Sequence, residues 1–280
     1  MNENIRVKKH SGDTEQYSPS KLYRSLERAG ADKQTVEQIL YELEAKVFDG
    51  ITTTQIYKLA FQLLRKIERS TASRYSLRKA IMELGPSGFP FEQLVGALIN
   101  SLGYQTQVGI MVKGKCVGHE LDVVARNKHE MFMVECKFYN SQGKNCNVQV
   151  PLYINSRFND VKQTWENDPA NKGLKMTGWV VTNTRFTADA TDYGKCAGLT
   201  MISWDYPHGN SLRELVEKSG LYPVTVLTSL SRKQKEFLLG NNVVLCSHLL
   251  QKPEAFGRLG LDIARQEKVL KEAASLCSRL

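Results

Sequence analysis

Two acidic residues and a lysine, carried on two neighbouring strand-like runs, are the side chains best placed to do chemistry in this chain. Asp122 lies on the first run, and Glu135-Cys136-Lys137 ends the second. Because side chains alternate along a strand, Glu135 and Lys137 should share one face while Cys136 points to the other. The intervening residues 123–134 allow the two strands to pair as a hairpin, which would bring Asp122 beside Glu135.

A pair of neighbouring carboxylates indicates a site for a hard divalent cation. The two negative charges repel each other, and an ion such as Mg²⁺ or Mn²⁺ removes that repulsion by binding both. A lysine beside them can orient or polarise an attacking water and offset negative charge on a phosphorane-like transition state. We therefore expect Asp122 and Glu135 to bind a metal ion, with Lys137 next to it, in a site that hydrolyses phosphodiesters.

The surrounding elements must hold these two strands side by side. Residues 89–103 read as a helix with Phe91, Val95, Leu98 and Leu102 facing inward. Strand-like runs cover 104–112, 120–125 and 131–138, followed by a helix near 148–165, a strand at 178–182, a helix near 187–196 and a strand at 199–204. This order predicts an α/β sandwich around a mixed central sheet.

This constellation resembles the PD-(D/E)XK nuclease fold and, more closely, Mrr-type restriction endonucleases. The likeness covers about residues 86–206 and rests on Phe91-Glu92, Gly118 through Asp122, Glu135-Cys136-Lys137, and Thr182 through Thr187 with the helix after it. It implies that Asp122 and Glu135 bind the metal and that Lys137 is the catalytic lysine. It further implies a role in restriction or antiviral defence.

The same resemblance indicates further residues around the metal. Glu92 is implied as an accessory acid that reaches the metal directly or through water, and it completes the expected catalytic set of Asp122, Glu135, Lys137 and Glu92. Glu120 is a second candidate acid, because it stands where that family commonly has small or acidic residues. Gln149, at the start of the following helix, is a candidate contact for phosphate or water.

The N-terminal third has a different pattern. Ile5 and Val7 alternate with charged residues, a turn follows at residues 11–13, and strand character resumes at residues 15–17. Four segments with apolar residues at helical spacing then reach about residue 84, and Gly85-Pro86-Ser87-Gly88 breaks the chain. The pattern predicts a small hairpin followed by a four-helix bundle.

This layout resembles the ATP-cone domain, a regulatory nucleotide-binding module of ribonucleotide reductases and of the repressor that controls their genes. The matching residues are Val7-Lys8-Lys9-His10 with Gly12, Tyr17, Lys21-Leu22, and Ala72 through Leu77. The family usually has Lys-Arg followed by Asp or Asn where this chain has Lys8-Lys9-His10. The implied nucleotide-binding residues are Val7, Lys8, Lys9 and Lys21.

Physical chemistry supports a phosphate site at this hairpin. Triphosphate oxygens require several cations that converge from different elements, and Lys8, Lys9 and Lys21 can meet where the hairpin joins the first helix. The start of that helix after Ser18 adds backbone N–H donors. Because the chain has no Walker A loop, we interpret ATP or dATP as an allosteric effector and not as fuel.

Charge and composition limit the other possibilities. The 280 residues carry a net charge of +9, which suits a polyanionic partner such as DNA. There is no run of 18 apolar residues and no apolar leader, and the six cysteines are scattered, so we expect a cytoplasmic protein with free thiols. Residues 221–280 read as a basic helical region that is either an oligomerisation element or loosely like a helix-hairpin-helix clamp, with Arg232, Lys233 and Lys235 near Gly240.

Together these observations predict three domains, at residues 1–85, 86–220 and 221–280. The expected function is a Mg²⁺-dependent endonuclease of double-stranded DNA, regulated by ATP or dATP through the N-terminal module. Nucleotide binding would shift the assembly of a homo-oligomer, since a ligand acts through its different affinities for the states it connects. The alternatives are a nucleotide-responsive DNA-binding regulator without catalysis, and a DNA-repair nuclease.

Overall fold

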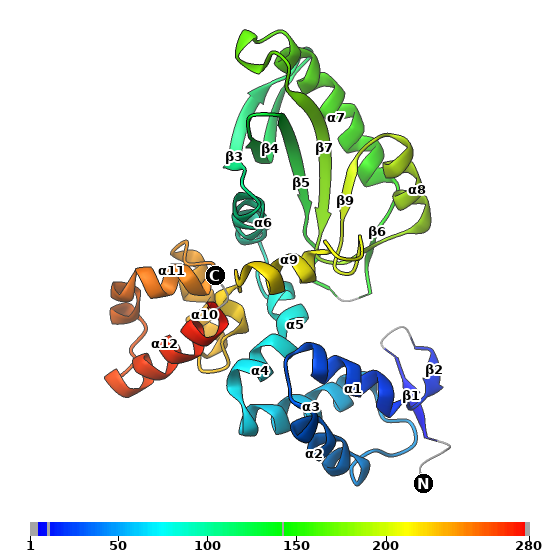
Figure 1. Cartoon of the computed structure of the whole chain (residues 1–280), viewed down its shortest axis with the longest axis vertical. Coiled ribbons are helices and arrows are strands. Elements are labelled where there is room, and N and C mark those ends of the chain that lie inside the picture. Colours follow the sequence, from blue (N-terminus) through cyan, green and yellow to red (C-terminus); the bar gives the residue numbers. More distant parts are fainter. Residues whose placement is uncertain (1–4, 10–11, 142, 278–280) are drawn as a thin grey trace.

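The protein is described by a computed structural model, which covers residues 5–9, 12–141 and 143–277. Figure 1 shows a twisted sheet at one end, a helical bundle with a hairpin at the other, and a third group of helices beside the junction. His10 and part of the expected turn at residues 11–13 lie outside the described residues, as do the last three residues of the expected C-terminal helix. Within the described ranges, no helix is long and apolar enough to cross a membrane.

The central sheet is mixed, as the sequence predicts. Its order is β3-β4-β5-β7-β9, with β4 antiparallel to both of its neighbours, β3 and β5, and with β7 and β9 parallel to β5. The bounds are Gln105–Lys113 (β3), Gly118–Arg126 (β4), Glu130–Lys137 (β5), Lys175–Thr182 (β7) and Thr200–Ile202 (β9). The short strands β6 (Asn145–Cys146) and β8 (Arg185–Phe186) pair separately.

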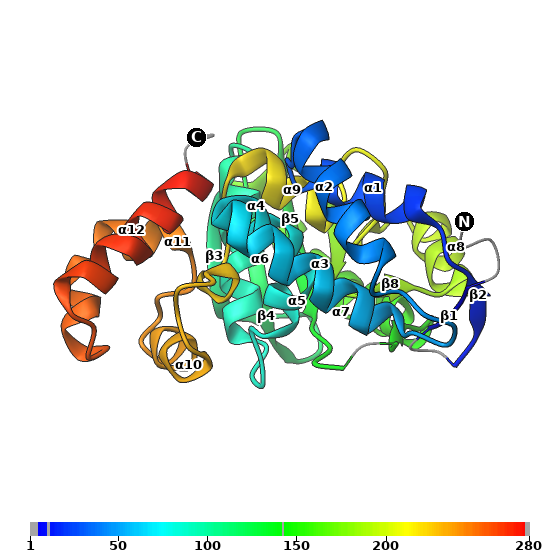
Figure 2. The same ribbon diagram turned by 90° about the horizontal axis from the view of Figure 1, so that it is seen from below.

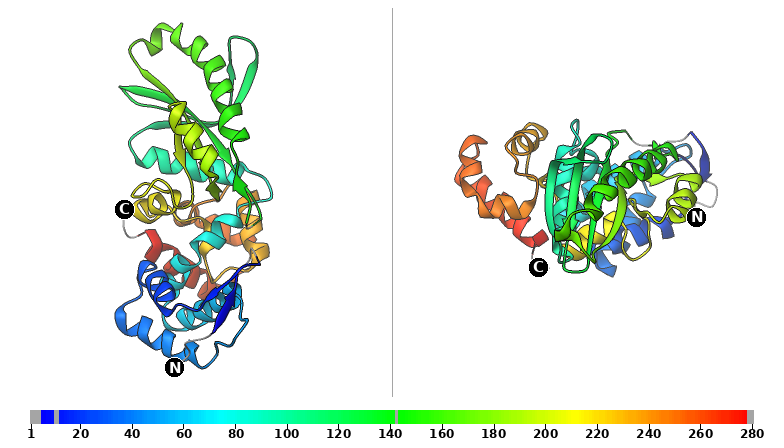
Figure 3. Two further views of the ribbon diagram at one scale, coloured as in Figure 1. Left: turned by 90° about the vertical axis from the view of Figure 1, so that its right-hand side faces the viewer. Right: turned by 90° about the horizontal axis from the view of Figure 1, so that it is seen from above.

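Helices cover both faces of this sheet (Figures 1 and 3). On one face lie α6 (Phe89–Ser101) and α9 (Leu212–Ser219), and on the other lie α7 (Gln149–Glu166) and α8 (Ala188–Cys196). The sheet therefore separates two apolar cores, one under α6 and one under α7. Leu102, which we expected to face inward, is 49% exposed because α6 ends at Ser101 and Leu102 is only its capping residue.

The N-terminal part is a hairpin packed on a helical bundle. The hairpin is β1 (Arg6–Lys8) with β2 (Thr14–Gln16), and the helices are α1 (Pro19–Arg28), α2 (Lys33–Glu44), α3 (Thr53–Ile67), α4 (Arg69–Tyr75) and α5 (Leu77–Met82). Side-chain caps fix where two helices begin, since Asp32 accepts from the Thr35 N–H and Thr52 forms a capping box with Gln55. The last segment, expected as one helix, is divided at Ser76.

The division at Ser76 lets α5 leave the bundle. The Ser76 hydroxyl donates to the Ser73 carbonyl (2.9 Å), and Leu77 and Ile81 then pack in the core that contains α6 and the C-terminal helices. The buried Thr225 hydroxyl fixes the helix further by donating to the Ala80 carbonyl (2.7 Å). By sequence α5 follows the bundle, whereas by packing it belongs to the next core. The expected boundary at residue 85 stays a prediction.

The C-terminal residues form three helices on one side of the molecule (Figure 2). They are α10 (Arg232–Gly240), α11 (Cys246–Gln251) and α12 (Ile263–Cys277). A 3-10 turn at Val224–Val226 precedes α10, another at Pro253–Arg258 joins α11 to α12, and a third at Pro169–Asn171 lies in the sheet domain. Helix α11 begins only at Cys246, because residues 243–245 are extended and the Val224 N–H donates to the Val244 carbonyl (2.8 Å). These helices share one apolar core with α5 and α6, so the expected boundary at residue 220 also stays a prediction.

A single buried carboxylate joins the C-terminal helices to the bundle. Glu272 of α12 is 5% exposed, and its carboxylate accepts from the Ser73 hydroxyl (2.8 Å), from the Thr228 N–H (2.6 Å) and hydroxyl (2.8 Å), and from the Ser229 N–H (3.0 Å) and hydroxyl. Burial raises the pKa of Glu272, but the hydrogen bonds from Ser229, Thr228 and Ser73 outweigh it and hold the pKa below its ordinary value of 4.5. The ionised carboxylate therefore stabilises the junction.

Replacing Glu272 by alanine should lower the free energy of unfolding by about 3 kcal/mol at pH 7, because buried donors lose a charged acceptor. A carboxyl whose folded pKa is depressed contributes stability that is present above its unfolded pKa and is lost as pH falls through the folded value. The difference between Glu272→Ala and wild type, measured by urea unfolding, should thus shrink towards acid pH. Glu267→Ala, at an exposed position of the same helix, is the matched control. An equal loss for both variants would contradict the role of Glu272.

Candidate functional site

Strands β4 and β5 separate at the residues that the sequence singles out. They pair regularly as far as Val123 and Val134. Beyond that pair, the Cys136 N–H donates to the Asp122 carboxylate (2.6 Å). A side chain thus replaces a backbone carbonyl as the acceptor, and the Asp122 carboxylate lies directly against the backbone between Glu135 and Lys137.

A kink in the sheet turns Asp122 towards β5. Leu121 packs in the core under α7 and Val123 in the core under α6, although residues two apart on a regular strand share a face. Gly109 of β3, with φ +65°, lies opposite Asp122, between two regular pairs of β3 and β4. Residues with side chains rarely adopt this conformation, so the glycine permits the kink.

Glu135 and Cys136 point to opposite faces of β5, as expected. Cys136 is buried in the core that contains α6, whereas the Glu135 carboxylate contacts Arg157 of α7. Lys137 ends the strand, and its carbonyl accepts from the Thr182 hydroxyl of β7 (2.8 Å). Its positive charge lowers the pKa of Asp122 and of Glu135. The Asp122 carboxylate accepts from the N–H of Cys136, the residue between Glu135 and Lys137. The structure therefore brings Asp122, Glu135 and Lys137 together.

Arg157 is a member of this site that the sequence analysis missed. Its guanidinium donates from Nη1 to Glu135 Oε2 (2.7 Å) and from Nη2 to the Glu120 carbonyl, so it bridges β5 and β4 where they separate. The side chains of Arg157 and Glu135 are 11% and 15% exposed, so this ion pair is shielded from solvent. The guanidinium also lies 5.5 Å from the centre of the Tyr153 ring. Tyr153 and Arg157 are one helical turn apart, and this spacing is the sequence feature that could have indicated a role for Arg157.

The remaining candidate residues lie around this centre. Glu92, in the first turn of α6, reaches the acids from the opposite face, and burial followed by the charge of Asp122 raises its pKa to about 7. Glu120 and Gln149 have exposed side chains. His119, next to the acids in sequence, is instead bonded to Asp160 of α7 (2.8 Å) and supports the end of β4.

The carboxylates repel one another in the absence of a cation. Burial first, and then the charge of Asp122, raises the pKa of Glu135 to about 7. The pKa of Asp122 is raised by burial as well, against the opposing effects of the Cys136 N–H and Arg157. Such shifts are typical of functional sites, where charges are clustered for a task and not for stability.

The donor set fits a small, hard cation. Among the described residues, no group of three or more His, Cys, Asp or Glu side chains is arranged to hold a metal ion alone. Mg²⁺ does not require one, because it is usually bound by one or two carboxylates together with waters and substrate phosphates. Asp122 and Glu135 supply two such carboxylates with raised pKa values, and a bound cation would relieve their repulsion.

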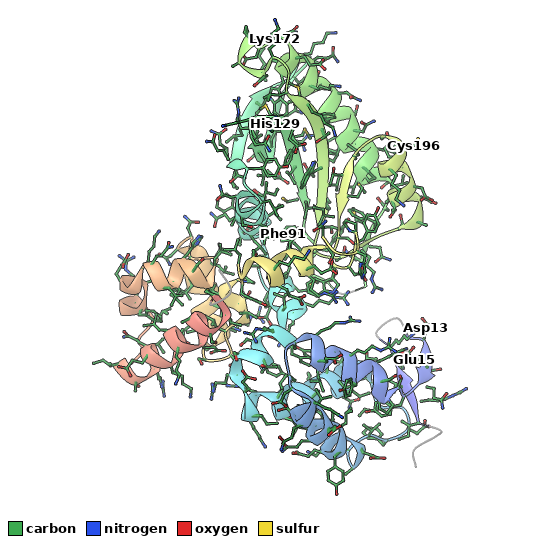
Figure 4. All side chains as sticks on the ribbon, viewed as in Figure 1. Asp13, Glu15, Phe91, His129, Lys172 and Cys196 are labelled. Atoms are coloured by element: carbon green, nitrogen blue, oxygen red, sulfur yellow. The ribbon has the colours of Figure 1, made fainter. Side chains whose placement is uncertain are left out.

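The expected nucleotide residues lie on the hairpin and at the start of α1. Lys9 and Lys21 both contact the Glu15 carboxylate at 2.9 Å, so two of the three expected lysines do converge (Glu15 is labelled in Figure 4). The Lys8 side chain is exposed, and its backbone pairs with Thr52 at the start of α3. Val7 is 3% exposed, and its side chain packs in the bundle core.

A cavity of about 330 Å³ lies at the start of α3, which follows the Thr52 that pairs with Lys8, and the sequence analysis did not identify it. It is formed by the first turns of α3 together with residues from α4 and α5. Its lining combines hydroxyl, aromatic and cationic side chains: Thr53, Thr54, Tyr57, Lys58, Tyr75, Arg78 and Lys79. The rings of Tyr57 and Tyr75 are stacked, with centroids 5.1 Å apart.

Two of the three basic residues expected to form a DNA clamp at α10 have partners within the protein. Lys235 is partly buried and donates to the Thr225 carbonyl (2.6 Å), and burial lowers its pKa. Arg232 forms an ion pair with Glu236 one turn along the helix (2.8 Å). Both cations thus have partners within the protein, and the clamp interpretation stays a prediction.

The sheet, its covering helices and the acids at the end of β5 define a nuclease-like domain of the restriction-endonuclease class. Residues 86–208 match the restriction endonuclease family, residues 5–83 match the ATP cone domain, and residues 222–277 match the AF1548-like C-terminal family. The two resemblances seen in the sequence are therefore confirmed.

About two thirds of the chain is similar to a protein of Archaeoglobus fulgidus. The chain belongs to the family of an uncharacterized protein of Archaeoglobus fulgidus, with 30% identity over 177 residues, which are 63% of this chain and 95% of that protein. It also resembles the crystal structure of AF1548, a protein of unknown function, at 28% identity and a TM-score of 0.55, covering 69% of this chain and 99% of the other.

Neutralising one acid should stabilise the metal-free protein. Asp122→Asn keeps an oxygen that can accept from the Cys136 N–H but removes the charge that raises the pKa values of Glu135 and Glu92. Because the folded pKa of Asp122 is raised, its ionisation costs stability as pH rises, and the cost is absent below the unfolded pKa. We expect a gain of about 1 kcal/mol at pH 8 that disappears in acid, measured by urea unfolding in EDTA.

The exposed Asp192→Asn, on α8, is the control and should leave stability unchanged. A loss of stability in Asp122→Asn at pH 8 would show that the carboxylates do not repel one another as described.

Proposed function

We propose that this protein is a Mg²⁺- or Mn²⁺-dependent endonuclease of double-stranded DNA, controlled by ATP or dATP and used in restriction or antiviral defence in the cytoplasm. The observation that carries the proposal is the convergence of Asp122, Glu135 and Lys137 where β4 and β5 separate. A protein that only binds DNA gains nothing from carboxylates held together against a polyanion, since they repel the phosphates.

In this mechanism the side chains have separate tasks. Asp122 and Glu135 would hold the cation, which supplies Lewis-acid character and a more acidic bound water. Lys137 would orient the attacking water and stabilise negative charge on the phosphate. Arg157 keeps one oxygen of Glu135 fixed and thereby orients the carboxylate. Glu92, with a pKa of about 7, can accept or hold a proton at neutral pH.

Cleavage should depend on both the acid and the amine. Asp122→Ala and Lys137→Ala should each lower the rate of plasmid cleavage at least about 100-fold, because each removes a charge that acts on the transition state. Controls are Asp192→Ala and Lys128→Ala at exposed positions of the same domain, and circular dichroism should show that all four variants are folded. Wild-type cleavage in Mg²⁺ but not in EDTA is expected.

The outcomes separate the candidate functions. Tight DNA binding without cleavage in any metal would support a DNA-binding regulator instead. Cleavage confined to branched or damaged DNA would support a repair nuclease. Cleavage by Lys137→Ala at the wild-type rate would remove this assignment of the site.

Regulation by nucleotide follows from the position of the cone. Lys9 and Lys21 now bind Glu15, and a triphosphate offers several oxygen acceptors to the same two amines. The neighbouring cavity is lined by α5, which packs in the core shared with the nuclease domain. We propose that a nucleotide in this region changes the packing of α5 and, through it, the activity or the assembly of a homo-oligomer.

The double variant Lys9→Gln/Lys21→Gln should bind ATP and dATP at least about tenfold more weakly, because it loses two charge-assisted contacts. Isothermal titration calorimetry measures the affinity, and sedimentation velocity with each nucleotide measures any change in assembly. Lys33→Gln/Lys172→Gln, also a loss of two charges, is the matched control. Unchanged affinity in the first variant would contradict the hairpin site, and unchanged mass and activity with every nucleotide would contradict the regulation.

A further inference from the structure

A basic groove lies between the bundle and the C-terminal helix. It has a volume of about 970 Å³ and runs between the α3–α4 junction and α12. Six cationic side chains line it against two glutamates, and they come from three separate parts of the chain: Lys46, Arg65, Lys66, Arg69, Lys268 and Lys271. The groove is on a different part of the molecule from Asp122 and from the hairpin lysines.

The two glutamates of the groove leave most of this positive charge in excess, and both accept hydrogen bonds from neighbouring groups. Glu68 accepts from the hydroxyls of Ser70 (2.7 Å) and Thr71 (2.5 Å) at the start of α4. Glu272 is the buried carboxylate whose acceptors are already used by Ser73, Thr228 and Ser229. Within the described part of the chain, none of the six cations forms an ion pair within 4.0 Å. An anionic ligand would therefore meet positive charge that the protein leaves unbalanced.

The two walls of the groove are held at a fixed separation. Glu272 bonds the Ser73 hydroxyl across the junction, and Arg74 of α4 donates to the Ser275 carbonyl of α12 (3.2 Å). Arg65 donates to the Thr228 carbonyl (3.2 Å). Lys268 and Lys271 lie one turn apart on the exposed side of α12 and take no part in these links. The helices that carry the cations are thus fixed relative to one another.

The lining also indicates which anion it suits. No aromatic side chain is among the described residues that line the groove, so nothing there can stack a nucleobase. Sites for single strands and for free nucleotides usually use such stacking, whereas duplex DNA keeps its bases inside and presents only phosphates. A row of cations without a stacking platform therefore matches the backbone of a duplex.

We propose that this groove binds the phosphate backbone of double-stranded DNA and extends the contact surface of the enzyme beyond its cleavage site. The proposal rests on the proposed nuclease function and adds a second, sequence-independent contact. Each cation that neutralises a phosphate releases a counterion, so the groove should contribute directly to the salt dependence of binding.

The test compares Lys268→Gln/Lys271→Gln with Lys172→Gln/Lys175→Gln, a loss of two charges at the far end of the sheet domain (Lys172 is labelled in Figure 4). Fluorescence anisotropy of a labelled duplex in EDTA, over a salt series, measures the full-length protein without cleavage. The groove variant should bind about tenfold more weakly at low salt and lower the slope of log affinity against log salt by about 1 to 2. The control should match wild type.

Three results would contradict the proposal that the groove binds duplex DNA. Wild-type protein that binds duplex DNA while the groove variant keeps the same affinity and slope would remove this inference and leave the nuclease proposal intact. Weaker binding of ATP or inorganic triphosphate by the groove variant, with unchanged duplex binding, would assign the groove to free phosphates. Wild-type protein that binds no duplex at any salt concentration would remove both proposals together.

Discussion

Repulsion among partly buried carboxylates is the constraint around which the sheet domain is built. Asp122, Glu135 and Glu92 all have raised pKa values, which means that folding brings them together against their electrostatic preference. Arg157 and Lys137 offset part of that cost, and the apolar cores on the two faces of the sheet supply the rest. A sheet that needed only to be stable would continue its ladder between β4 and β5. This one gives up regular pairing there, and the Asp122 carboxylate accepts from the Cys136 N–H instead.

The bundle and the C-terminal helices are connected to that domain by packing and not by flexible linkers. Leu77 and Ile81 of α5 share a core with Phe91 of α6 and Val244 of the C-terminal region. A ligand that favours a different position of α5 must therefore change contacts next to the sheet, which is the physical requirement for coupling between distant sites.

Much of the fold could be predicted because its signals are local. Alternation along Glu135-Cys136-Lys137 gave the correct faces, and helical spacing located α6 and the bundle. The kink at Asp122 and the division at Ser76 depend on packing, although Gly109 inside a strand was a signal for the first. The Ser211–Glu214 capping box marks α9 and was missed. Arg157 and Glu272 could not be found, since each resembles an ordinary surface residue of an amphipathic helix until its partners, 22 and 199 positions away, are known.

The place of α5 limits how this chain could have been assembled in evolution. Helix α5 follows the bundle in sequence but packs in the core of the next domain. The bundle and α5 therefore cannot be exchanged as a unit without changing that core. A cone acquired from an unrelated protein would bring a last helix of the wrong shape, leaving a hollow in the core that contains Phe91 or overpacking it. Residues on both sides of the contact between α5 and the nuclease-like domain therefore had to change together. Relatives that carry the two modules should show paired substitutions at this contact.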